Sequence, residues 1–207
     1  MDQKIRLIDG KDIPISKYRH AVIELLFQTG EELYTYQFIS KEIIDLVIGK
    51  SLELKGSLFS ADEATVALNG NDLVGIEIGF TGTCFRKRQI TMKPIWDNVG
   101  KKDLKLIIKR SRQCRYLTPS IESNSYYVLG LSVKKEWQGK GVGKLLMNNA
   151  MERARNLGLK QIQLDVMSNY QAVSFYQALG FQCLVASTSP LPKENGVPTM
   201  FRMSSHI

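Results

Sequence analysis

The stretch that decides the fold is residues 129–166, LGLSVKKEWQGKGVGKLLMNNAMERARNLGLKQIQLDV. The apolar run over 126–133 predicts a strand, and the three glycines of QGKGVG (138–143) predict a loop after it. A helical pattern follows and should end at Gly158, because glycine readily adopts the left-handed conformation that closes a helix. Alternating apolar residues over 160–166 then predict a second strand. The centre of the fold is therefore a strand, a glycine loop, a helix and a strand.

The glycine loop suits the binding of an anion. A helix that begins near Gly141 presents unpaired backbone N–H groups and the positive end of its dipole at its first turn. Glycines allow this backbone to approach a phosphate closely, and Lys140 and Lys144 add positive charge. The alternative is a plain turn that only joins the strand to the helix.

The spacing of the glycines excludes two common nucleotide-binding loops. A nucleotide-kinase loop needs four residues between its glycines and a Ser or Thr after the lysine. Here three residues separate Gly139 from Gly143, and Leu145 replaces the hydroxyl residue. A dinucleotide-binding loop needs G-x-G-x-x-G, which the third glycine breaks by coming too early. The pattern Q/R-x-x-G-x-G/A, in contrast, is matched by Gln138, Gly141 and Gly143.

Strands and helices alternate along the rest of the chain. Asn69-Gly70 is a dipeptide that suits a tight β-hairpin, and it joins two apolar runs within 64–80. The order of elements predicts one mixed α/β domain over residues 1–207. Before the hairpin we expect a strand at 4–9, a helix from Pro14 and Ser16 to Gly30, a capping box at Thr29 and Glu32, and a helix from Ser40 to Gly49. After the hairpin we expect a basic loop at 81–94 and a helix around Leu104, Ile107 and Ile108. Near the end of the chain we expect a short helix at 169–179, strands at 181–187 and 198–204, and a proline-rich loop at 189–198.

The positive charge is concentrated in one segment. The formal net charge of the chain is +8, but residues 86–115 alone hold eleven Lys and Arg against two acids, a net +9. Residues 1–80 hold eight bases and thirteen acids, a net −5. We therefore predict a basic loop–helix insertion at about 81–120. Its cations could bind a nucleic acid or an acidic partner. Nucleic acid is disfavoured, because aromatic residues are sparse (Trp96 and Tyr116) and an exposed amphipathic helix also accounts for the cations.

Composition argues for a cytoplasmic protein. No stretch approaches the roughly 18 consecutive apolar residues of a membrane span, and the opening MDQKIRLIDG lacks the features of a signal peptide. Cys84, Cys114 and Cys183 are odd in number and lack metal-ligand spacing, which suits a reducing cytosol. His20 and His206 have no ligand or triad neighbours, so we expect no metal site.

Two parts of the chain resemble a known family. The stretch 125–204 carries the glycine loop and the motif N-x-x-A-x-x-F-Y-x-x-L-G-F at 169–181. Together with the hairpin at 62–80, it resembles the GCN5-related N-acetyltransferase (GNAT) superfamily. The resemblance implies a mixed, twisted central sheet flanked by helices, in which the parallel strands 126–133 and 160–166 splay apart. It also implies acetyl-CoA as the donor, held between these strands, with CoA as the product.

The resemblance assigns donor-binding residues one by one. The acetyl-pantetheine arm would pair with the backbone of Leu131, Ser132 and Val133, like an added strand. The Val133 N–H would also stabilise the oxyanion formed in the reaction. Asn169 would bond the arm, or would cap the following helix. The pyrophosphate would sit on Gln138, Gly139, Lys140, Gly141, Val142 and Gly143, with Lys144 close by.

Two further side chains are candidates for proton transfer. Tyr176 would act as general acid and protonate the leaving CoA thiolate, although its apolar stripe also suits a core aromatic residue. Glu77, on the second strand of the hairpin, would act as general base directly or through water. The alternative for Glu77 is a solvated strand residue. Histone-acetylating relatives carry a Glu where this chain has Tyr127, which argues against a histone-type substrate.

The expected reaction moves an acetyl group from acetyl-CoA to a primary amine, by direct attack through a tetrahedral intermediate. Glu31 and Glu32 lie where the resemblance implies the acceptor wall, and they would suit a cationic amine on a small molecule or a protein. The alternative is a non-catalytic CoA-binding module. A homodimer is left open, and no membrane partner is expected.

Overall fold

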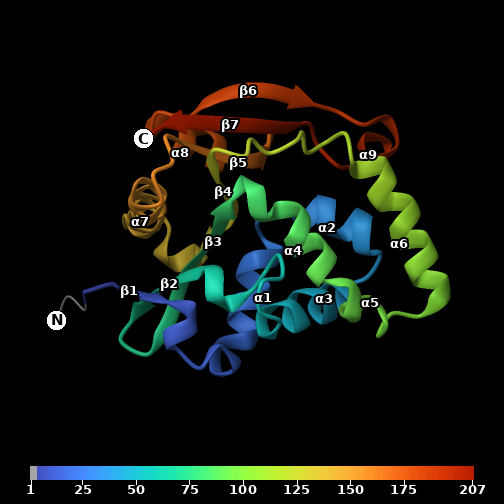
Figure 1. The fold of residues 1–207 in the computed structure, drawn as a ribbon, viewed down its shortest axis with the longest axis horizontal. Helices are drawn as coiled ribbons and strands as arrows, with labels where there is room; N and C mark the ends of the chain where they lie inside the picture. Colours follow the sequence, from blue (N-terminus) through green and yellow to red (C-terminus); the bar gives the residue numbers. More distant parts are fainter. Residues whose placement is uncertain (1–3) are drawn as a thin grey trace.

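The computed structural model describes residues 4–207 and contains one seven-stranded sheet (Figure 1). Its strand order is β1-β2-β3-β4-β5-β7-β6, and each neighbouring pair is antiparallel except β4 and β5. The strands are β1 (Arg6–Asp9), β2 (Ala64–Asn69), β3 (Asp72–Thr81), β4 (Ser125–Val133), β5 (Gln161–Met167), β6 (Gln182–Ser187) and β7 (Met200–His206).

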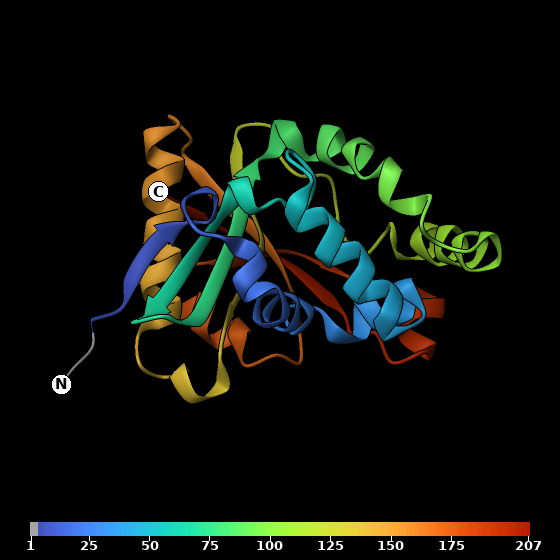
Figure 2. The same ribbon diagram turned by 90° about the horizontal axis from the view of Figure 1, so that it is seen from below.

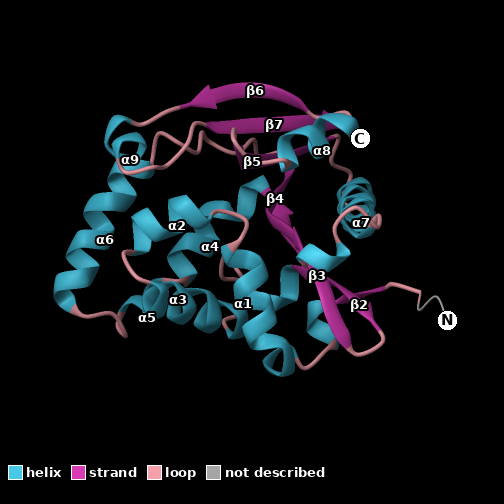
Figure 3. Ribbon diagram, turned by 180° about the vertical axis from the view of Figure 1, so that it is seen from behind, coloured by secondary structure: helices cyan, strands magenta, loops and turns pink. Residues whose placement is uncertain are grey.

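Helices cover both faces of the sheet (Figures 1 and 3). The helix α7 (Val142–Asn156) packs against one face with α8 (Ala172–Ala178), and α1 (Arg19–Phe27) packs against the other face with α3 (Lys41–Glu53). The remaining helices are α2 (Glu31–Phe38), α4 (Phe85–Thr91), α5 (Lys93–Trp96), α6 (Lys101–Cys114) and α9 (Pro190–Glu194), with short 3-10 turns at Gly10–Asp12, Ile15–Tyr18, Ala61–Glu63, Gly82–Cys84 and Lys135–Trp137.

The two parallel strands diverge, as the family resemblance implies. β4 pairs with β5 only where residues 125–128 face residues 161–164. Beyond Val128 the described residues show no pairing between the two strands, although β4 continues to Val133. The polar backbone of residues 129–133 is therefore open on the β5 side. The mixed sheet with splayed parallel strands, flanked by helices, is confirmed.

The core is divided by the sheet. Along β3, Ile76 and Ile78 face α1 and α3 and are fully buried, while Glu77 between them faces α7. This is the two-residue alternation expected of a strand. The core on the α7 side contains Tyr126 and Met147, among others. None of the helices within residues 4–207 is both long enough and apolar enough to cross a lipid bilayer.

Several turns and helix ends lie where the sequence predicts them. The hairpin between β2 and β3 turns at Asn69-Gly70, and Gly70 has a φ of 60°. Gly158 and Gly180 end α7 and α8 with φ values of 72° and 88°, in the left-handed region that favours glycine. Ser40 caps α3, since its hydroxyl accepts the N–H of Ile43 at 3.3 Å.

Two predicted helix boundaries are wrong. Gly30, not Thr29, precedes α2, and the Thr29 hydroxyl instead donates to the carbonyl of Leu26 at 2.7 Å. The capping box is therefore absent at this helix. Gly49 does not end α3, which continues to Glu53. The guanidinium of Arg19 packs where a Cβ at Gly49 would stand, so a side chain here would require that flexible group to move.

The segments predicted as a basic loop at 81–94 and as a proline-rich loop contain helices. The first forms α4 and α5, which lie beside one another along one edge of the molecule (Figure 2). Arg88 is 7% exposed, pairs with Glu63 and donates to the Ser57 carbonyl at 3.0 Å. These partners are distant in sequence, which explains why the local pattern did not reveal the helix. The second contains α9.

Candidate active site

The glycine loop forms an open cradle at the start of α7. Gly139 and Gly141 have φ values of 72° and 83°, which few residues other than glycine adopt. Nothing lies within 4 Å of the position that a Cβ would take at either residue. The first hydrogen bond of the helix comes from the amide of Leu145 to the Gly141 carbonyl at 3.0 Å. The amides of residues 142–144 therefore have no acceptor within the helix and point outward.

The cradle is attached to the free edge of β4. Gln138 donates through Nε2 to the Val133 carbonyl at 3.1 Å, which ties the loop to the end of the strand. Lys140 lies over the ring of Trp137, with Nζ 4.9 Å from the ring centroid. The open backbone edge of β4 at residues 129–133 therefore leads directly to the outward amides of residues 142–144. This surface fits a ligand that carries amide groups at one end and a pyrophosphate at the other.

Tyr176 lies on α8 against the same side of the sheet as α7. It is 6% exposed, and its ring packs against Phe175 and Phe181 at centroid distances of 5.2 and 5.6 Å. No hydrogen bond of its hydroxyl to residues 4–207 is formed. Burial raises the pKa of Tyr176, and the Glu77 carboxylate raises that pKa further. The hydroxyl is therefore protonated at neutral pH and has a proton to donate.

Asn169 does not cap the following helix. The helix α8 begins at Ala172, and Gln171 occupies the position before it. Asn169 is exposed between β5 and α8. It lies at the end of the wedge, the space that opens between β4 and β5 beyond Val128. The capping interpretation is wrong because the chain makes a turn, with Tyr170 N–H donating to the Met167 carbonyl, before the helix starts. A contact of Asn169 with the donor stays a prediction.

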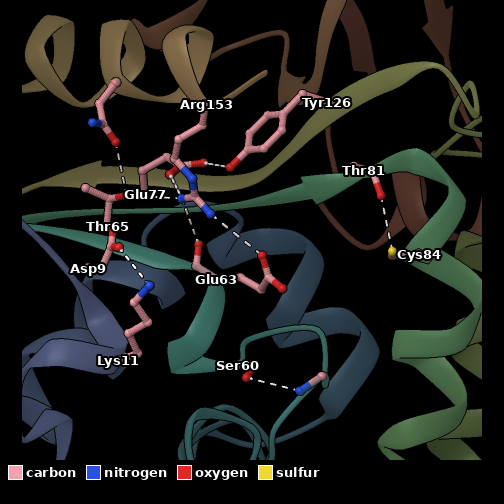
Figure 4. Close-up of polar contacts among 12 residues, drawn as sticks. Asp9, Lys11, Ser60, Glu63, Thr65, Glu77, Thr81, Cys84, Tyr126 and Arg153 are labelled. Carbon is pink, nitrogen blue, oxygen red and sulfur yellow. Dashed lines mark hydrogen bonds and ion pairs between the residues drawn. The ribbon is translucent and has the colours of Figure 1, made fainter. Parts of the chain in front are cut away.

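Glu77 is enclosed beneath α7 rather than solvated (Figure 4). Its two carboxylate oxygens accept from the Tyr126 hydroxyl at 3.3 Å and from Arg153 Nη1 at 3.4 Å. Arg153 also donates to Thr65 Oγ1 at 3.1 Å and pairs with Glu63 at 3.7 Å. The interpretation of Glu77 as a solvated strand residue is therefore wrong.

The buried position of Glu77 changes its proton affinity. Burial raises the pKa of Glu77 from its ordinary value of 4.5 to about 7, although Arg153 and the Tyr126 hydrogen bond act to lower it. Because the folded state holds the proton more tightly than the unfolded chain, this group stabilises the fold most below pH 4.5. Its contribution is lost as the pH rises through about 7.

Glu77→Gln should remove this pH dependence. The difference in the free energy of unfolding between the wild type and Glu77→Gln is expected to fall between pH 4.5 and 7. Urea titrations at several pH values across this range measure that difference. The exposed Glu152→Gln is the matched control, and its difference from the wild type should not change with pH. A constant difference for Glu77→Gln would mean that Glu77 keeps an ordinary pKa in the folded protein.

Glu31 and Glu32 line a pocket of about 860 Å³ on the other side of the sheet from Glu77. Both lie in the first turn of α2, and Glu32 accepts the Tyr170 hydroxyl at 2.5 Å. Gln28, in the same pocket, accepts the Ser132 hydroxyl at 3.3 Å. The pocket therefore adjoins the half of β4 that is free of β5, and its wall carries two carboxylates.

The structure brings most of the expected site residues together and separates one. Leu131 to Val133 and the glycine loop lie at the unpaired half of β4, Tyr176 belongs to the core cluster against which Leu131 packs, and the acidic pocket adjoins Ser132. Glu77 does not line this pocket. Sequence reasoning missed Tyr170 and Gln28. Tyr170 follows Asn169 within the recognised motif, which could have marked it, whereas nothing in the local pattern distinguishes Gln28.

Part of the chain matches known proteins in sequence. Residues 95–181 match the model of the Acetyltransferase (GNAT) family, a range that includes β4, the glycine loop, α7, β5 and α8. Human N-acetyltransferase 8B is 35% identical over 66 residues, which are 31% of this chain. The match spans 29% of the length of that relative.

Solved structures agree over nearly the whole chain. An N-acetyltransferase from Staphylococcus aureus Mu50 aligns with a TM-score of 0.71 at 14% identity, over 98% of this chain and 100% of the other. The polyamine N-acetyltransferase of Drosophila melanogaster, which forms N-acetylagmatine, aligns with a TM-score of 0.59 at 14% identity, over 99% and 100% of the two chains. At such low identity, these likenesses establish the fold. Residues 95–181 therefore match the GNAT acetyltransferase family, and the splayed sheet and the glycine cradle agree with that match.

Proposed function

We propose that this protein transfers an acetyl group from acetyl-CoA to the primary amine of a cationic acceptor. The observation that carries the proposal is the position of the acidic pocket beside the free half of β4, where Gln28 contacts Ser132. A donor held along this strand would present its thioester next to an acceptor held by carboxylates. The two reactants would meet in one place, which lowers the entropic cost of their reaction.

The donor would occupy the wedge and the cradle. Its arm would pair with the open edge of residues 131–133, and its pyrophosphate would lie against the outward amides of residues 142–144. Lys140 and Lys144 would add positive charge around the phosphates. Nothing blocks this approach at Gly139 or Gly141. These features of the chain's own backbone support the proposal that CoA binds here.

These positions suggest a role for each group that would take part in the reaction. The donor supplies an acetyl group as a thioester. The Val133 N–H would donate to the carbonyl oxygen as negative charge develops on it. As the neutral amine attacks the thioester carbon and the C–S bond breaks, the Tyr176 hydroxyl, kept protonated by burial, would give its proton to the departing thiolate. The proton released by the amine nitrogen would return to Tyr176 through water. We do not extend the proposal to Glu77 as a direct base, because its carboxylate is enclosed under α7 and held by Arg153.

Glu31 and Glu32 would hold the cationic acceptor. Their carboxylates line the pocket, and Tyr170 fixes the orientation of Glu32 through its hydrogen bond. A polyamine or a guanidinium-bearing amine has the charge that this wall would attract. The Drosophila enzyme of the same fold is named for such substrates, which supports the choice of acceptor class.

A screen of amine classes against acetyl-CoA tests the proposal directly. Release of free CoA thiol is measured with polyamines, agmatine, amino acids and lysine peptides as acceptors. We expect turnover with polycationic amines and little with acceptors that carry net negative charge. Binding of CoA without turnover on any amine would instead indicate a non-catalytic CoA-binding module.

Glu31→Gln with Glu32→Gln should weaken the use of cationic acceptors. We expect kcat/KM for the best polyamine to fall roughly tenfold, because each ion pair near the surface contributes up to about 1 kcal/mol. The KM for acetyl-CoA should stay unchanged, since neither residue adjoins the cradle. The matched control is Glu152→Gln, an exposed carboxylate on α7. Unchanged polyamine kinetics in the double variant would remove these residues from the acceptor site.

A further inference from the structure

We propose that the groove between α4, α5 and α6 binds an acidic amphipathic segment of a partner protein. The groove has a volume of about 1250 Å³, and residues 118–121, which lead into β4, belong to its lining. Most of its lining comes from the segment between β3 and β4, whose path Figure 2 shows, and Leu33 and Gln37 of α2 complete it. The proposed acetyl transfer does not use this segment.

The floor of the groove is apolar. It includes Phe85 and Trp96 from one side and Leu104, Ile107 and Ile108 from α6. Ile107 is 2% exposed and belongs to the core, whereas its neighbour Ile108 is 46% exposed. Apolar side chains left in water around a large hollow are typical of a surface that a partner covers.

The rims of the groove are positively charged on both sides. Arg86 and Lys93 lie on the side of α4 and α5, and Arg112 and Arg115 lie on the side of α6. No Asp or Glu lines the groove. Within residues 4–207, none of these four cations forms an ion pair. Their charge is available to carboxylates of a bound partner, which would be drawn in by the local field.

The groove is distinct from the proposed acceptor pocket. The helices α2 and α6 lie between them and are joined by hydrogen bonds from Tyr36 to Gln113 and from Gln37 to Ser111, at 2.7 and 2.9 Å. The acceptor pocket adjoins the end of β4 at Ser132, while the groove adjoins the segment before its start. The acceptor pocket is lined by Glu31, Glu32 and Arg110, a net charge of −1, whereas the groove is lined by cations without a carboxylate. A cationic amine that suits the carboxylates of the pocket would be repelled from the groove.

The shape and chemistry of the groove favour a protein segment over a nucleic acid or a small molecule. Small-molecule pockets commonly have volumes of about 300–1,000 Å³, below that of this groove. Single-stranded nucleic acids need exposed aromatic faces for their bases. Trp96 instead stacks on Phe38, with ring centroids 6.2 Å apart, and the exposed ring of Tyr116 is covered on one face by the Arg115 guanidinium, 5.2 Å from its centroid. An amphipathic helix with an apolar face and acidic flanks would match both the floor and the rims.

A designed peptide provides the probe. It is a fluorescein-labelled helix of about 18 residues, with Leu at the i, i+3, i+4, i+7 spacing and Glu at the flanking positions. Fluorescence anisotropy with the full-length protein at physiological salt measures its affinity. We expect binding that Arg112→Glu with Arg115→Glu weakens at least about tenfold, since two attractive charge pairs become repulsive. Ile108→Asp should weaken it similarly, because the apolar contact is lost.

Matched controls show whether weaker peptide binding comes from the groove itself, from a general change of charge or from misfolding. Arg155→Glu with Lys160→Glu changes the same charge at exposed positions outside the groove. Leu157→Asp places an acid at another exposed apolar residue, 58% exposed. Both should bind the peptide like the wild type. The binding of CoA to every variant, followed by calorimetry, reports that the fold is intact.

Several results would overturn the proposal. One is equal affinity for a peptide of the same composition whose Leu spacing is scrambled, since charge alone would then explain binding. Tighter binding of a single-stranded oligonucleotide at the same salt concentration would assign the groove to nucleic acid. A dimer in sedimentation experiments that Arg112→Glu with Arg115→Glu dissociates would assign it to a second copy of this chain. If the designed peptide did not bind at all, the proposal would be rejected directly.

Discussion

Gly141→Asp is expected to abolish the binding of CoA, with a loss of affinity of about 100-fold or more. Gly141 has a φ of 83° at the start of α7, and the outward amides of residues 142–144 follow it. A carboxylate here would stand where the pyrophosphate is expected, and two anions at this distance repel one another strongly. Calorimetric titration with CoA measures the loss.

Gly141→Asn is the matched control, because Asn has the size of Asp without its charge. Both residues visit the left-handed conformation more readily than most, and a Cβ at Gly141 meets open space. Both variants should therefore fold, with thermal unfolding close to that of the wild type. Gly141→Asn should lose far less affinity than Gly141→Asp. Equal CoA affinity in the two variants would show that no anion binds at this loop.

Tyr176→Phe is expected to lower kcat about 100-fold while leaving the affinity for acetyl-CoA nearly unchanged, as loss of a general acid predicts. The Phe ring preserves the packing against Phe175 and Phe181. Only the proton donor is removed. Steady-state kinetics give kcat, and calorimetry with CoA gives the affinity.

Tyr126→Phe provides the comparison for this substitution. Tyr126 is a buried tyrosine on the same side of the sheet, and its hydroxyl contacts Glu77 rather than the wedge. Removal of that hydroxyl should change kcat little. A loss of CoA affinity in Tyr176→Phe, with kcat otherwise normal, would mean that Tyr176 is a structural residue and that another group protonates the thiolate.

Local chemistry made several features predictable from the sequence. Tight turns are set by the few residues within them, so Asn69-Gly70, Gly158 and Gly180 could be placed correctly. The glycine spacing of residues 138–143 could be read in the same way, because a backbone cradle depends on the conformation of successive residues. The alternation along β3 also placed Glu77 correctly on the face opposite Ile76 and Ile78.

Distant contacts decided what the local patterns missed. Gly49 could be mistaken for a helix end because its partner, the guanidinium of Arg19, lies 30 residues earlier in the sequence. The helix α4 is fixed in part by Arg88, which reaches Glu63 and Ser57 in an earlier part of the chain. A pattern over a few neighbouring residues does not indicate such long-range contacts.

The proposed donor side could be predicted from the sequence alone. The strand, the glycine loop and the start of α7 are contiguous, and their backbone conformations follow from residues 126–144. The proposed acceptor side became visible only in the folded structure. Glu32 and Tyr170, 138 residues apart, meet in one pocket because α2 packs beside the start of α8. The packing of α7 over the sheet likewise enclosed Glu77. Side chains from separate elements acquire their surroundings only when those elements pack together.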